Sequence, residues 1–163
     1  MPVAWRDQLS TGNLLIDQDH KYLICLFNSI ELALTTPDNM RHLPLFFDQL
    51  FAYTQEHFAR EEKLQLKIEY PRYADHKYEH QQILARLEEV NNELRTLLGA
   101  PEEGTDEGTD DGGSGAARHT RASLEKALGK DILGLAREWV IDHVAKADQD
   151  LARYLRQYDP EFR

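Results

Sequence analysis

The sequence predicts an all-α fold, an up-down-up-down four-helix bundle, and three observations lead to it. Apolar residues recur at spacings of three and four in four successive segments, as in amphipathic helices. No strand-like alternation or hairpin turn competes with that pattern. Most links between the segments are short, which favours antiparallel neighbours. The 163 residues, 41% of them hydrophobic, suffice for a single domain, residues 1–163, with its own core.

The first two helices are predicted at residues 16–34 and 43–68. Pro37 closes the first, and Tyr70-Pro71 breaks the second, because proline lacks a donor and disfavours helix in the residue before it. One face of the first helix carries Leu23, Leu26, Phe27 and Ile30. One face of the second carries Phe46, Phe47, Leu50, Tyr53, His57, Glu61 and Leu64.

The last two helices are predicted at residues 72–98, ending before Gly99, and at residues 120–158. The fourth repeats the apolar pattern through Leu124, Leu128, Leu135, Trp139, His143 and Leu151. Ahead of the first helix, an N-terminal arm extends through Asn13. We expect Trp5 and Leu9 to pack this arm against the bundle.

Residues 99–120 are expected to form a flexible, acidic, glycine-rich loop inserted between the third and fourth helices. They contain six of the nine glycines and six acidic residues, and EGTD occurs twice in succession. Such a composition buries too little apolar surface to offset its ordering entropy. An EF-hand loop does not fit, because counting from Asp106 puts Ala117 at the twelfth position, where a bidentate Glu is required.

Charge, hydropathy and cysteine content exclude several classes of protein. A net charge of -10 argues against a nucleic-acid surface, which needs a basic patch. No apolar stretch approaches the roughly 18–20 residues of a membrane span, and no signal peptide is evident. The single cysteine, Cys25, excludes an internal disulfide framework and fits a reducing cytosol. We therefore expect a cytoplasmic monomer without a nucleic-acid partner or a membrane span.

Histidines and acidic residues at helical spacing predict a metal site. His57 and Glu61 are four residues apart, as are His76 and His80, so each pair projects from one helix face. His20 and His143 lie on the other two predicted helices. Groups that face inward from four helices can meet at one level of a bundle. Imidazoles with a few carboxylates suit iron, zinc, copper or nickel better than calcium or magnesium.

Plainer interpretations and other metal chemistries fit less well. A single histidine or an i,i+4 pair is commonly a surface feature, and His42 and His119 are expected to be surface residues. A zinc hydrolase would need Glu directly after His76, where Lys77 stands. Ferritin-like proteins use Glu-x-x-His, and no Glu lies three residues before any histidine.

The motifs around these residues resemble those of the hemerythrin family. The resemblance lies in Ile16-Asp17-Gln18-Asp19-His20, His57-Phe58-Ala59-Arg60-Glu61-Glu62, Tyr70-Pro71, His76-x-x-x-His80 and Trp139-Val140-Ile141-Asp142-His143 with Asp148. It covers residues 5–158 except the 99–120 loop. The size resembles that of the single-domain bacterial members, the bacteriohemerythrins. The resemblance implies reversible dioxygen binding, for oxygen storage, transport or delivery, and no catalytic residues.

The ligands that the resemblance implies are seven side chains around two iron ions. His76, His80 and His143 would hold a coordinatively full iron, and His20 and His57 one with an open position for dioxygen. Glu61 and Asp148 would bridge both ions together with an oxo or hydroxo group. Each ferrous ion would give one electron to dioxygen, leaving a ligand at the peroxide level. Five neutral imidazoles and two carboxylates leave the pair positively charged, which disfavours the oxidation states needed to break the O–O bond.

Asp148 is the one ligand that ideal helix geometry does not select. At 100° per residue it lies about 140° around the helix from His143, whereas Asp150 is closer in angle but about 10 Å along the axis. Either the metal pair sits beside the helix or the helix bulges locally.

The surroundings of the site are predicted from neighbouring residues. Leu23, Phe27, Phe58, Trp139 and Val144 are candidates for a dry oxygen pocket, although their types are equally those of an ordinary core. Glu62, Asp75 and Glu79 are candidate hydrogen-bond partners of the ligand histidines.

Two other functions stay open. One is an oxygen or redox sensor that acts through a protein partner, because the acidic loop joins two ligand-bearing helices. The other is a di-iron enzyme acting on peroxide or nitric oxide.

Overall fold

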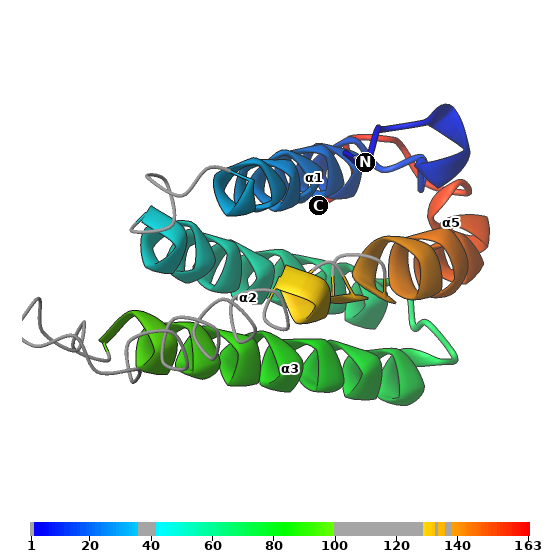
Figure 1. Ribbon diagram of the computed structural model, residues 1–163. Coiled ribbons are helices and arrows are strands. Elements are labelled where there is room, and N and C mark those ends of the chain that lie inside the picture. The colour runs from blue at the N-terminus through cyan, green and yellow to red at the C-terminus, as the bar shows by residue number, and fades with distance from the viewer. Residues whose placement is uncertain (1, 36–41, 100–128, 133, 136–137) are drawn as a thin grey trace, which may run out of the picture.

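The computed structural model describes residues 2–35, 42–99, 129–132, 134–135 and 138–163, and all regular elements among them are helical (Figure 1). The elements are η1 (Asp7–Leu9), α1 (Leu14–Leu34), α2 (Leu43–Lys67), α3 (Tyr73–Gly99), η3 (Glu138–Ala147) and α5 (Asp148–Leu155). Residues 129–132 and 134–135 are helical as well. None of the described helices is both long and apolar enough to cross a membrane.

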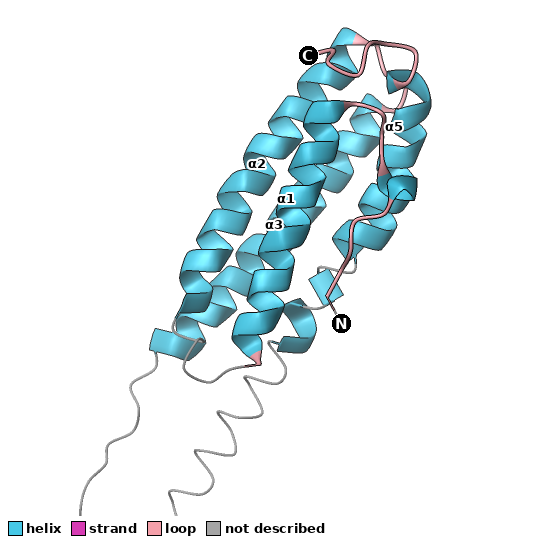
Figure 2. Cartoon of the chain, turned by 90° about the horizontal axis from the view of Figure 1, so that it is seen from above, coloured by secondary structure: helices cyan, strands magenta, loops and turns pink. Residues whose placement is uncertain are grey.

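Four helical rods lie side by side and alternate in direction, the fourth being η3 continued by α5 (Figures 1 and 2). The four-helix bundle predicted from periodicity is therefore confirmed. The predicted 99–120 loop, apart from Gly99, lies outside the described residues, and so do residues 120–128 of the predicted fourth helix and His119.

Local sequence explains where the helices begin and end. Asn13 caps α1, because its Oδ1 accepts from the amides of Leu15 (3.1 Å) and Ile16 (3.2 Å), which starts the helix two residues earlier than predicted. After α2 the chain reverses through Glu69, whose φ is +51°, and the Tyr70 amide donates to the Gln65 carbonyl at 2.9 Å. The predicted break at Tyr70-Pro71 thus separates α2 from α3.

One continuous hydrophobic core joins the helices. Trp139, Phe47 and Phe58 are its largest fully buried side chains. The N-terminal arm packs on this core through Val3, Trp5 and Leu9, as predicted for the last two. The core therefore holds the four helices around the level at which the polar side chains described below meet.

Candidate metal centre

Five histidines and two carboxylates meet inside the bundle, and every one of the four rods contributes. Their ligand atoms form two groups that share Glu61, one with His76, His80 and His143, the other with His20 and His57, each spanning no more than 4.8 Å. These are called here the three-histidine half and the two-histidine half. The seven predicted ligands are the two halves together with Asp148.

Each carboxylate presents one oxygen to each half. Glu61 Oε1 lies 2.7 Å from His76 Nε2, and its Oε2 lies 3.7 Å from His57 Nε2. Asp148 Oδ2 lies 3.2 Å from His20 Nε2, whereas Oδ1 lies 3.2 Å from His76 Nε2 and 3.3 Å from His143 Nε2. Both side chains therefore stand where a carboxylate joining two ions would stand.

A π-helix brings Asp148 to the same side as His143. The segment η3, Glu138–Ala147, is wound as a π-helix and ends where α5 begins at Asp148. Because its hydrogen bonds run from residue i to i+5, a residue five positions on returns close to the same face. The local bulge that regular α-helical geometry required is present. Asp150 points instead to the surface, where it pairs with Arg72 at 2.8 Å.

Burial and unmatched polar atoms fit this donor set to a metal. All seven side chains are at most 3% exposed. The Nε2 atoms of the five histidines, Glu61 Oε2 and both Asp148 oxygens make no hydrogen bond. Unmatched polar groups at such depth are costly unless something binds them. Imidazole nitrogens and carboxylate oxygens are donors that suit non-haem iron.

Interactions within the cluster lower the pKa values of its two carboxylates and raise that of His76. Burial would raise the pKa of Glu61 and Asp148, but the surrounding histidines lower it well below the usual range. Burial would lower the pKa of His76, but Asp148 and Glu61 raise it to about 10. At His57 burial prevails, and its pKa is lowered. Contacts within the cluster therefore favour the ionised form of Glu61 and Asp148 and the protonated form of His76.

Three of the histidines predicted as ligands are oriented by carboxylates on their outer ring nitrogens. His80 Nδ1–H donates to Glu62 (3.1 Å) and His143 Nδ1–H to Glu79 (3.2 Å), two of the three partners considered from sequence. Asp75, the third, is exposed on α3. Such bonds leave Nε2 as the free nitrogen that faces the centre.

Asp19 supports the third of these histidines, His57, a role that the sequence did not predict. His57 Nδ1–H donates to Asp19 Oδ2 at 3.3 Å, and the carboxylate also accepts from Arg60 Nε (2.8 Å) and the Tyr53 hydroxyl (2.7 Å). Burial would raise the pKa of Asp19, but these three donors lower it to about 2. Sequence spacing carries no signal for a contact across two helices; the only hint was an acidic residue beside His20.

Gln65 was also missed, although its position one turn after Glu61 could have indicated it. It is fully buried, and its Nε2 donates to Glu61 Oε1 at 2.9 Å.

The five candidate pocket residues all belong to the buried core around the centre. The Trp139 ring meets His20 edge-on at 5.9 Å, and Phe27 stacks on Trp139 at 5.4 Å. Phe58 stacks on His80 at 3.8 Å and lies 5.4 Å from His57, so it touches both halves. Leu23 and Val144 are fully buried in the same cluster. Whether dioxygen occupies this apolar region stays a prediction.

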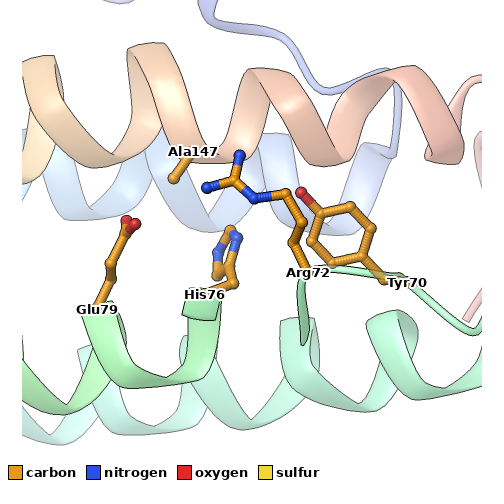
Figure 3. A pocket seen from close by; sticks show the side chains of 5 residues that line it. All are labelled: Tyr70, Arg72, His76, Glu79 and Ala147. Atoms are coloured by element: carbon orange, nitrogen blue, oxygen red, sulfur yellow. The ribbon is translucent and has the colours of Figure 1, made fainter. Parts of the chain in front are cut away.

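A small pocket of about 10 Å³, the space of one water molecule, reaches the three-histidine half from outside (Figure 3). Its walls are Tyr70, Arg72, His76, Glu79 and Ala147. His42, by contrast, is an exposed residue at the start of α2, as predicted.

Comparison with known proteins gives a consistent result. The profile of the Hemerythrin HHE cation binding domain matches residues 11–155. A bacteriohemerythrin of Stenotrophomonas maltophilia is 32% identical over 106 residues, which cover 59% of this chain and 69% of that protein. One of Ralstonia nicotianae is 26% identical over 164 positions, covering 100% and 96%.

A hemerythrin of Themiste dyscrita is 33% identical over 87 residues, covering 53% of this chain and 70% of that protein. No solved structure matches the chain. The profile match includes all seven residues that meet in the bundle, from His20 to Asp148. This chain therefore belongs to the hemerythrin family.

Proposed function

We propose that this protein binds dioxygen reversibly at a non-haem di-iron centre, for oxygen storage, transport or delivery. The observation that carries the proposal is the convergence of five buried histidine Nε2 atoms with two carboxylates that each face both halves. Two ferrous ions bound there would supply the electrons that dioxygen takes up on binding. Membership of the hemerythrin family supports the same chemistry.

The unequal numbers of histidines give the two halves different tasks. His76, His80 and His143 with both carboxylates offer five protein donors to one ion, whereas His20 and His57 offer only four with the same carboxylates. We infer that the dioxygen position belongs to the two-histidine half. Trp139 and Phe27 on that side supply an apolar wall that limits water.

The composition of the donor set favours binding over turnover. Histidines are neutral when they ligate, so the protein contributes only the two negative charges of Glu61 and Asp148. A centre with net positive charge disfavours the higher oxidation states that O–O cleavage requires. We therefore propose that the protein is an oxygen carrier and not an enzyme.

Iron content and optical spectra under nitrogen and air test this function. We expect two irons per chain and a visible absorption band that appears in air and disappears when oxygen is removed. A protein that keeps both irons but shows no oxygen-dependent spectrum would contradict reversible binding. Sustained consumption of peroxide or nitric oxide with a reductant would instead indicate an enzyme.

The ligand assignment has its own test. His57→Ala removes a fully buried residue of the two-histidine half, so the iron of that half and the oxygen-dependent band should both be lost. His42→Ala changes an exposed histidine and should leave both unchanged. Equal behaviour of the two variants would refute the assignment.

A further inference from the structure

Gln65 is buried, and hydrogen bonds hold both its side chain and its backbone. Its side chain is 0% exposed, and its Nε2 donates to Glu61 Oε1 at 2.9 Å. Because an ionised carboxylate can only accept, this contact settles which end of the amide faces Glu61. The backbone of Gln65 is held as well, since its main-chain carbonyl accepts from the Tyr70 amide just after α2.

Packing alone does not explain an amide at this position. The other polar atom, Gln65 Oε1, is buried and makes no hydrogen bond within the described part of the chain. A methionine or leucine would fill a similar volume without an unmatched acceptor, which is costly at such depth. What the amide provides, and an apolar side chain does not, is the N–H that contacts Glu61.

This contact falls on only one of the two Glu61 oxygens. Oε1 is the atom nearest the three-histidine half, 2.7 Å from His76 Nε2 and 3.5 Å from His80 Nε2. Oε2 faces His57 and makes no hydrogen bond. Gln65 therefore restrains the rotation of Glu61 by holding the oxygen that belongs to the three-histidine half.

We propose that Gln65 is a positioning residue that fixes which Glu61 oxygen serves which half of the site. A carboxylate can accept this hydrogen bond on one lone pair of Oε1 and still ligate through the other. Partners of this kind orient ligands and strengthen metal binding through preorganisation. The role rests on the proposed function, because it matters only if Glu61 joins two metal ions.

Replacement of the amide by an apolar side chain of similar length tests the role. Metal-free Gln65→Met and wild-type protein are titrated with Co²⁺ against a competing chelator, together with Gln55→Met, an exposed position on the same helix. In Gln65→Met, binding of the ion in the three-histidine half should weaken about 10–100-fold. Binding of the other ion, and both affinities of the control, should change little. Metal-free Gln65→Met should unfold near the wild-type temperature, because removal of the unmatched acceptor offsets the lost hydrogen bond to Glu61.

One further variant identifies which ion is affected, and another replaces Gln65→Met if that protein does not fold. In a His20→Ala background, where only the three-histidine half is complete, Gln65→Met should retain the full loss of affinity. Gln65→Asn keeps an amide but withdraws it by one methylene, so it should weaken the same ion if Gln65→Met does not fold.

Unchanged affinities, or equal weakening of both ions, would overturn the role of Gln65. Weakening confined to the two-histidine ion would overturn it as well. The Co²⁺ measurements do not involve oxygen. If wild-type iron protein failed to respond to oxygen while Gln65→Met still weakened one ion selectively, the oxygen-binding proposal would fall and the role of Gln65 would stand.

Discussion

The two halves of the centre differ in how the fold supports them. In the two-histidine half, His57 is oriented by Asp19, a carboxylate only 4% exposed that Arg60 and Tyr53 hold in place. In the three-histidine half, the corresponding partners are Glu62, 19% exposed, and Glu79, 43% exposed. The small pocket also opens on that half. The carboxylate that supports His57 is thus more buried than those that support His80 and His143, whereas His20 Nδ1 makes no hydrogen bond in the described part of the chain.

The largest effect is expected at Asp148, because this one side chain serves both halves of the centre. Asp148→Ala removes one oxygen from each half and should abolish stoichiometric binding of both ions, measured as iron per chain. Asp150→Ala is the matched control, because it removes only exposed ion pairs, those with Arg72 and Arg153. Loss of iron in Asp150→Ala with full occupancy in Asp148→Ala would mean that Asp150, and not Asp148, serves the two halves.

Asp148 also marks the limit of what sequence could predict. Periodicity and breaks located the helices, and spacing of four identified His57 with Glu61 and His76 with His80, because both are properties of an ideal helix. The π-helical winding of η3 departs from that ideal, and hydrophobic periodicity carries no signal for it. Only resemblance to a family selected Asp148 in advance.

Contacts between helices were the other part that sequence did not yield. Glu62 and Glu79 were considered because they neighbour ligands along the chain, and both do reach histidines. Asp19 reaches His57 across two helices, 38 residues away, and Gln65 acts through an amide that carries no metal-binding signal. Which residues meet across a bundle depends on helix rotation, which a periodic pattern fixes only coarsely.

The next largest effect should separate the two halves. Asp19→Asn keeps the shape of the side chain but removes the negative charge of the carboxylate that accepts from His57. The two-histidine ion should therefore bind about 10–100-fold more weakly. The three-histidine ion should change little. Stepwise Co²⁺ titration of the metal-free protein measures both, and equal weakening of both ions would show that the halves do not have separate supports.

The same carboxylate gives a pH dependence of defined sign in the metal-free protein. The pKa of Asp19 is about 2 when folded and 3.8 when unfolded, so its contribution is complete above 3.8 and is lost as pH falls toward 2. It amounts to about 2 kcal/mol by the size of the shift. Urea unfolding of wild type and Asp19→Asn should therefore give a difference that shrinks between pH 5 and pH 3. A constant difference would mean that the charge of Asp19 does not stabilise the fold.

The smallest effect is expected at the partner most open to solvent. Glu79→Gln weakens the contact with His143, but water screens a side chain that is 43% exposed, so the three-histidine ion should lose no more than about fivefold in affinity. Glu62→Gln, at 19% exposure, should fall between Glu79→Gln and Asp19→Asn. Chelator competition on all three variants gives the order. If Glu79→Gln proved as harmful as Asp19→Asn, burial of the supporting carboxylate would not be what distinguishes the halves, and the number of protein ligands alone would have to account for it.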